Sequence, residues 1–170
     1  MTRKALGLLA ACLVAWSCGY RLRGTGSYLP SHIKRISIPM FKNMTTRYEL
    51  DLKLTRAVID EMTARAKVEV LAEGGRGDAV LIGEVLSFTV NPIAFSGGAA
   101  ADRYNITVTA RIVLRDLVNQ KVLFANPSFV YVKEYEVPEG SDFESLETDA
   151  IGKAAEEFAR TIVVNILEGF

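Results

Sequence analysis

Cysteine and histidine are scarce in this sequence, which has two cysteines and one histidine among 170 residues. The histidine is His32, and the cysteines are Cys12 and Cys18, near the N-terminus. Beyond Cys18 the chain therefore lacks the residues for cysteine–histidine zinc sites, thiol nucleophiles and disulfide frameworks. Carboxylates, hydroxyls and lysines remain, and every soluble protein has these. The composition predicts no metal, no catalytic residue and a non-enzymatic role.

The chain also lacks an excess of charge of either sign, since 20 Lys and Arg balance 20 Asp and Glu. Proteins that bind nucleic acid usually present a strongly basic face, so we expect no such partner. Long apolar runs are missing as well. The longest candidate, residues 5–16, is too short to cross a bilayer comfortably as a helix of about 20 residues.

Residues 5–16 instead belong to an export signal. They follow Arg3 and Lys4 and precede the small residue Ser17, and this charged, apolar, small order marks such signals. Because Cys18 comes next, the pattern predicts a lipoprotein signal over residues 1–17. Its removal would leave Cys18 as the first residue, carrying a covalent lipid on a membrane surface outside the cytoplasm. No other cofactor is expected.

A second cleavage position competes within the same signal. Residues 9–12 (LAAC) fit the usual lipoprotein cleavage box better than residues 15–18 (AWSC), in which Trp16 is unusual. Cutting before Cys12 would shorten the apolar part to roughly seven residues, the lower limit for a signal. We favour Cys18, with Cys12 and an ordinary secretory signal as the alternatives.

The rest of the chain divides into a tether and one domain. Residues 18–31 are rich in Gly, Ser and Arg and predict a lipidated tether, while residues 32–170 predict a single domain. Two amphipathic helices are expected there, the first starting with the capping-box pattern of Thr46 and Glu49 and the second with that of Ser141 and Glu144. Their apolar stripes comprise Leu50, Leu54, Val58 and Met62, and Ile151, Ala155, Phe158, Ile162 and Ile166.

Strands are expected around these helices. Residues 33–41, 68–71, 79–90, 104–115 and 121–135 are the candidates. Pro39 indicates an edge position or a strand end, and Pro92 is expected to close the third candidate. The Gly-rich residues 73–78 precede an extended run rather than a helix, so they predict a turn and not a phosphate site. Together the elements predict an α+β two-layer sandwich, with two helices on one face of a mostly antiparallel or mixed sheet of about four strands.

Residues 18–24 (CGYRLRG), directly after the signal, resemble the mature start of the LptE family of lipopolysaccharide-assembly lipoproteins. The similarity continues through residues 36–43 (ISIPMFKN), 54–57 (LTRA) and 83–88 (GEVLSF). Residues 28–30, 111–116 and 121–124 also resemble the family. The order of elements agrees as well, so the resemblance covers nearly the whole chain beyond the signal.

The resemblance implies a function that composition alone does not. LptE proteins lie at the periplasmic side of the Gram-negative outer membrane, in a one-to-one complex with the large β-barrel LptD. They act partly as a plug within the barrel, help it assemble and help deliver lipopolysaccharide to the outer leaflet. Members of the family can also bind lipopolysaccharide.

The residues that would carry such contacts are basic. The polar sheet face and its hairpin end offer Arg111, Arg115, Lys121 and Lys133 for lipopolysaccharide phosphates or for the barrel wall. A solvated strand face would have the same appearance. Phe95 and Tyr104 are candidate partner anchors, although aromatic residues are more often buried in a core. A ligand role is not expected for His32.

Two other functional classes remain as alternatives. The strand and helix that open the domain also resemble periplasmic lipoproteins that activate peptidoglycan synthases or form secretion pores, but a pore would need more than one long hairpin. A hydrolase could use Asp142 with Glu144, or Asp60 with Glu61, yet helix capping and solvation explain both pairs.

Because no second exposed apolar stripe is visible, we expect a monomer in isolation.

Overall fold

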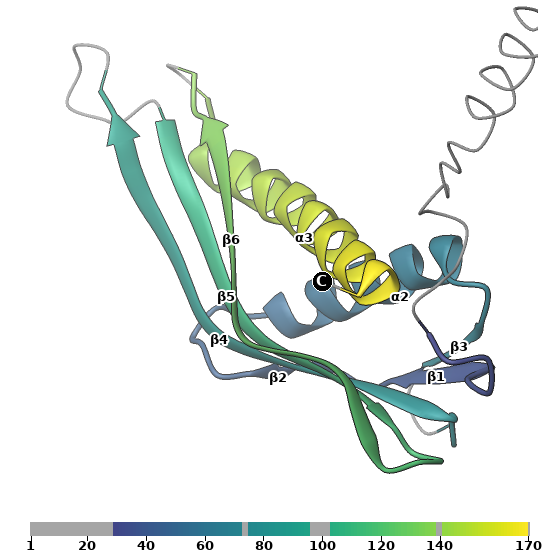
Figure 1. Ribbon diagram of the computed structural model, residues 1–170. Coiled ribbons are helices and arrows are strands. Elements are labelled where there is room, and N and C mark those ends of the chain that lie inside the picture. Colours follow the sequence, from purple (N-terminus) through teal and green to yellow (C-terminus); the bar gives the residue numbers. More distant parts are fainter. Residues whose placement is uncertain (1–28, 73–74, 96–102, 139–140, 170) are drawn as a thin grey trace, which may run out of the picture.

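The computed structural model describes residues 29–72, 75–95, 103–138 and 141–169 (Figure 1). The signal, Cys18 and most of the predicted tether lie outside the described residues. The elements are β1 (Arg35–Ile38), β2 (Lys42–Asn43), α2 (Leu50–Arg65), β3 (Glu69–Ala72), β4 (Ala79–Ala94), β5 (Arg103–Asp116), β6 (Lys121–Glu136) and α3 (Phe143–Glu168).

Both helices cover one face of a single sheet, so the predicted α+β sandwich is confirmed (Figure 1). The strand order is β3-β1-β4-β5-β6, and β2 pairs with β4 beyond β1. β4, β5 and β6 pair antiparallel, whereas β1 is parallel to β3 and β4, and β2 is parallel to β4. The sheet is therefore mixed, as expected, but it has six strands rather than about four.

Pro39 explains part of the difference in strand number. It follows the last residue of β1, and the chain rejoins the sheet as the separate two-residue strand β2. Proline has no N–H for a sheet ladder, so it ends strands. β1 itself lies inside the sheet between β3 and β4. Ile36 and Ile38 are buried, but Met40 lies past the break and is 44% exposed.

Pro92 does not close β4, which was expected to end there. The strand continues to Ala94 through a register shift between Pro92 and Ala94. Beyond Val85, β4 pairs only with β5 among the described residues. Proline is tolerated on such an edge because no neighbouring strand needs its missing N–H.

Side chains alternate along β5, and its apolar residues Ile106, Val108, Ala110, Ile112 and Leu114 are all buried beneath the helices. Near Asn126 and Pro127, β6 contains a β-bulge. Ala110 pairs with Phe129 and Ile112 with Asn126, so Pro127 and Ser128 together oppose Arg111. This extra residue reverses which β6 side chains face the helices.

Both predicted capping boxes are wrong in detail. α2 begins at Leu50 after Glu49, which has φ 57° and makes no side-chain cap. Thr46 is no cap because a turn at residues 43–47, in which Asn43 bonds Thr45 and Arg47, occupies this stretch. In α3 the cap is Asp142, whose carboxylate accepts from Ser145 N at 3.3 Å.

The apolar stripes of both helices meet the sheet as predicted. Leu50, Leu54, Val58 and Met62 are fully buried on α2, and the five predicted α3 residues are buried too. Phe158 of α3 contacts the ring of Phe129 on β6 edge-on, with ring centroids 5.3 Å apart. Gly169 ends α3 with φ 76°, a left-handed conformation that glycine adopts readily. One core thus joins the two layers.

Candidate partner-facing sheet surface

The sheet face that points away from the helices is mixed in character. We call it the outer face, and it comprises Ile82, Glu84, Thr107, Thr109, Arg111, Val113, Arg115, Val122, Val130 and Val132. These residues pair across the strands and alternate with the buried ones, so they share one face. Val122, Val130 and Val132 are 54%, 54% and 51% exposed. The outer face is therefore part apolar and part polar.

Arg111 lies at the centre of the outer face. It is the register partner of Glu84 on β4, and its guanidinium nitrogen lies 2.6 Å from the Glu84 carboxylate. Both side chains remain partly exposed. A solvated pair of this kind contributes about 0–1 kcal/mol. The pair reduces the local charge without hiding the guanidinium.

Arg115 and Lys121 lie nearer the β5–β6 turn. Arg115 is exposed on the outer face opposite Val122, and Lys121 is exposed opposite Asp116 at the hairpin end. Among the described residues neither has an ion-pair partner within 4.0 Å. Arg111 and Arg115 thus share the outer face, whereas Lys121 pairs with the buried Asp116 and lies at the hairpin end beside that face.

Lys133 does not belong to this surface. It pairs with the buried Ile106, so it faces the helices, and its Nζ lies 2.7 Å from Glu157 Oε1 on α3. The Tyr131 hydroxyl donates to the same carboxylate. The hydrogen bonds from Lys133 and then from Tyr131 lower the pKa of Glu157. Placing Lys133 on the polar sheet face was wrong because the β6 bulge changes the alternation there.

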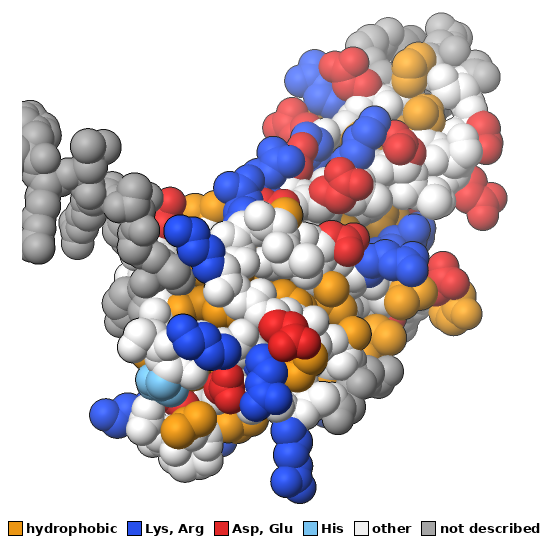
Figure 2. All heavy atoms as spheres, turned by 90° about the vertical axis from the view of Figure 1, so that its right-hand side faces the viewer, with side chains coloured by type: hydrophobic (Ala, Val, Ile, Leu, Met, Phe, Trp, Pro, Cys, Tyr) orange, Lys and Arg blue, Asp and Glu red, His pale blue; other side chains and the backbone are white. Residues whose placement is uncertain are grey.

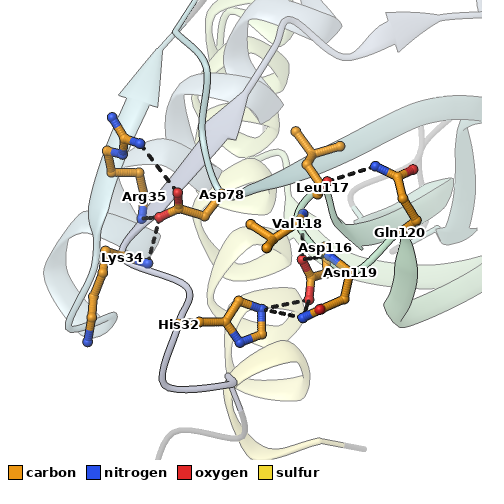
Figure 3. A network of polar contacts seen from close by, with 9 residues as sticks. All are labelled: His32, Lys34, Arg35, Asp78, Asp116, Leu117, Val118, Asn119 and Gln120. Atoms are coloured by element: carbon orange, nitrogen blue, oxygen red, sulfur yellow. Dashed lines mark hydrogen bonds and ion pairs between the residues drawn. The ribbon is translucent and has the colours of Figure 1, made fainter.

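Asp116 organises the hairpin end (Figure 3). Its buried carboxylate accepts from the backbone N–H groups of Val118 and Asn119, at 2.8 and 2.9 Å, and from His32 Nε2 at 2.7 Å. The Asn119 side-chain nitrogen lies 3.0 Å from the same carboxylate. Burial alone would raise the Asp116 pKa, but the hydrogen bonds from Asn119, His32 and Val118 outweigh it and lower the pKa to about 2.

Asp78 forms a second anchor beside the first (Figure 3). Its carboxylate accepts from the backbone N–H groups of Lys34 and Arg35, both at 2.9 Å. The bond from Lys34 is the largest cause of the lowered Asp78 pKa. The Asp78 carbonyl accepts from Leu117 N at 2.8 Å. Asp78 therefore links the segment that leads into β1 to the β5–β6 turn.

Sequence reasoning missed both aspartates and assigned His32 no role. The position of Asp116 at the start of a short turn was the available signal. Asp side chains there commonly accept hydrogen bonds from backbone amides two or three residues further along the chain. The bonds to His32 and Lys34 span 84 and 44 residues. A local sequence pattern cannot predict contacts between residues so far apart in the chain.

The predicted aromatic anchors differ in their surroundings. Phe95 is 60% exposed at the end of β4. Tyr104 is half-buried and stacks on Tyr135, with ring centroids 5.5 Å apart. Phe95 keeps the exposure that a partner anchor needs.

Charge on the neighbouring face is also mixed. Figure 2 shows acidic and basic side chains interspersed over the side seen there, with apolar side chains between them. Asp142, one of the carboxylates considered for hydrolysis, caps α3, and Glu61 pairs with Arg65. Within the described ranges, no three His, Cys, Asp or Glu side chains group closely enough to hold a metal. No described helix combines the length and apolarity needed to span a membrane.

Comparison with known proteins gives a family and a fold. The LptE family model, described as lipopolysaccharide-assembly, matches residues 33–166. Comparison with curated proteins found no match.

Three solved structures are similar in fold. A putative lipoprotein from Caulobacter crescentus is 15% identical with a TM-score of 0.51, and the match covers 76% of this chain and 87% of that one. Protein XCC0632 from Xanthomonas campestris is 13% identical with a TM-score of 0.56, covering 80% and 85%. The hypothetical protein CT253 from Chlamydia trachomatis is 12% identical with a TM-score of 0.52, covering 81% and 97%. At these identities the likeness concerns the fold alone.

Proposed function

Because the chain belongs to the LptE lipopolysaccharide-assembly family, we propose that it is the lipoprotein subunit of an outer-membrane lipopolysaccharide translocon. The family is non-enzymatic, and its members are lipopolysaccharide-assembly lipoproteins of the cell envelope. The match over residues 33–166 carries this proposal, because it spans every described strand and helix of the domain. A covalent lipid on Cys18 would hold the domain at the periplasmic side of the outer membrane.

The proposed partner is an LptD-like β-barrel in a one-to-one complex. Large outer-membrane β-barrels have a polar interior. A protein that fills one therefore needs a stiff body whose surface carries both polar and apolar side chains. The outer face supports such a role, since exposed valines of β6 lie there opposite threonines of β5 and near the Arg111–Glu84 pair. The core shared by sheet and helices supplies stiffness. We expect the domain to act as a plug and to assist assembly of the barrel.

Lipopolysaccharide phosphates would meet the basic residues of the outer face and of the adjoining hairpin end. Arg111, Arg115 and Lys121 lie along the half of the β5–β6 hairpin that approaches its turn. Guanidinium groups suit phosphate because they donate two parallel hydrogen bonds. Lys133 is excluded from this set, since Glu157 holds it on the helix side.

The experiment that tests the proposal is affinity purification of C-terminally tagged protein from detergent-solubilised outer membranes, with Cys18 intact. We expect one large heat-modifiable β-barrel in equal amount. Recovery of a peptidoglycan synthase would instead support the activator alternative. Recovery of the tagged protein alone would contradict the proposed complex.

A further inference from the structure

Four large apolar side chains are exposed around the connection between β2 and α2. Met40, Met44, Tyr48 and Leu52 are 44%, 56%, 83% and 43% exposed. They lie within thirteen residues of sequence. Single exposed apolar residues are ordinary, whereas Met40, Tyr48 and Leu52 line one hollow together, which favours a contact site. We call residues 44–49 the β2–α2 loop.

The β2–α2 loop is held in one conformation by its own side chains. Asn43 Oδ1 accepts from Thr45 N at 2.9 Å, and Asn43 Nδ2 donates to Arg47 O at 2.8 Å. Met44 N donates to Val85 O at 2.9 Å, which attaches the loop to β4. A surface fixed in advance loses less conformational entropy when a partner binds.

Arg47 connects the loop to both layers of the fold. Its guanidinium lies 3.4 Å from the Glu147 carboxylate on α3, and it sits 5.8 Å from the centre of the Phe88 ring on β4. The positive charge of Arg47 is therefore already engaged. Among the residues that line the hollow described next, the other charges are those of Glu49 and Asp51, while Lys53 in the first turn of α2 is not part of that lining.

A hollow of about 450 Å³ lies over this surface. Met40, Tyr48 and Leu52 supply its apolar lining, and Glu49 and Asp51 supply its carboxylates. None of the ion pairs among the described residues includes Glu49 or Asp51. Asn43, Thr45, Thr46 and the ion-paired Arg47 complete the lining, so its charges outside ion pairs are acidic and disfavour an anionic phosphate headgroup.

The geometry points to this hollow as a docking site for a segment of the barrel partner that carries a Lys or Arg beside an apolar side chain. The apolar side chain packs against Met40 and Leu52. The cation approaches the exposed Tyr48 ring and the two carboxylates, a combination of cation–π and charged hydrogen bonding. The inference rests on the proposed function, since it assigns a surface to the proposed partner.

The hollow is separate from the basic hairpin end. In Figure 1 the connection from β2 to α2 lies at the left of the sheet, and the β5–β6 turn lies at its lower right end. Contacts at two separated places would fix the orientation of the domain in its partner. The hollow offers carboxylates and the hairpin end offers basic side chains, so the hollow favours a cationic group and the hairpin end an anionic one.

Charge reversal tests the proposal in the tagged, lipidated full chain. The double variant Glu49→Lys/Asp51→Lys is purified from outer membranes beside the wild type and the control Asp60→Lys. Asp60 is an exposed carboxylate on the same helix but outside the hollow. We expect at least a tenfold loss of recovered barrel for the double variant and wild-type recovery for the control. Equal thermal unfolding of all three proteins shows that the fold is retained.

Site-specific photo-crosslinking provides a second measurement that needs no loss of charge. A crosslinking side chain replaces Tyr48, and Val118, 63% exposed on the β5–β6 turn, serves as the control position. We expect residue 48 to crosslink to a barrel peptide that contains Lys or Arg. Crosslinks to an acidic peptide or to a second copy of this chain, or none at all, would overturn the proposal.

The two proposals fail in distinguishable ways. If the wild type recovers the barrel and the double variant recovers it equally, the docking site is wrong and the proposed function stands. If the wild type recovers no barrel, the proposed function is wrong and the docking site falls with it.

Discussion

Gly83 on β4 lies directly against the ring of Phe41, so closely that a Cβ at residue 83 would stand 2.5 Å from Phe41 Cδ2. Both residues are buried. Phe41 follows the break at Pro39, and its backbone N–H donates to Thr55 Oγ1 on α2 at 2.9 Å. The absence of a side chain at residue 83 therefore lets the β1–β2 connection pack between the sheet and α2.

Gly83→Ala is expected to destabilise the domain by about 1–3 kcal/mol, because the added methyl group forces the Phe41 ring or β4 to shift. Urea unfolding of the domain measures the change. Gly152 on α3 is the matched control, since a Cβ there meets nothing within 4 Å. Gly152→Ala should stabilise by roughly 0.5–1 kcal/mol through helix propensity. Equal stability of wild type and Gly83→Ala would contradict the packing argument.

The fold class was predictable because the elements that define it have strong local periods. The i, i+4 stripe beginning at Leu50 and the alternation from Ile106 to Leu114 each depend on one segment alone. The extra strand was not predictable. Its existence depends on how the chain after Pro39 pairs with β4, which is a contact between distant segments.

The candidate site was only partly predictable for a related reason. Arg111 and Arg115 share a face because β5 pairs with β4 without a register shift between them. Lys133 lies beyond a bulge that one local pattern does not reveal, so its face was assigned wrongly. Likewise the side chain of Asn43 forms the turn that delays α2 to Leu50, and Thr46 only resembled a cap.

Asp116→Asn should lower the melting temperature at neutral pH. The amide replaces an acceptor of hydrogen bonds from Asn119, His32 and Val118 with a group that presents one acceptor atom. Because the folded pKa of Asp116 is about 2 and lies below its ordinary value of 3.8, the ionised carboxylate stabilises the fold above about pH 4. That stability disappears as the pH falls through about 2.

Thermal unfolding between pH 7 and pH 2 tests the Asp116 prediction. The difference between wild type and Asp116→Asn should be largest above pH 4 and should shrink towards pH 2. Asp60→Asn is the control, because Asp60 is exposed and forms no ion pair among the described residues. Parallel curves for wild type and Asp116→Asn across the whole range would refute the role assigned to this carboxylate.

Cys18→Ala should abolish lipid attachment and release the protein from membranes, because stable anchoring requires acyl chains. Mass spectrometry of the intact protein and membrane fractionation measure the two effects. Cys12→Ala is the matched control and should leave lipidation unchanged, since signal cleavage before Cys18 removes residue 12. The opposite pattern would assign the lipid to Cys12.

Substitutions at Arg115 and Lys133 should have separate effects, the first on lipopolysaccharide binding and the second on the stability of the fold. Arg115→Ala is expected to weaken lipopolysaccharide binding about fivefold, since an exposed charge contributes up to about 1 kcal/mol, with little change in urea unfolding. Lys133→Met should instead lower the stability, because it removes the ion pair with Glu157 that joins β6 to α3. A loss of about 0.5–1 kcal/mol in unfolding free energy is expected, with unchanged lipid binding. Weaker lipid binding by Lys133→Met than by Arg115→Ala would place the lipid on the helix side of the sheet.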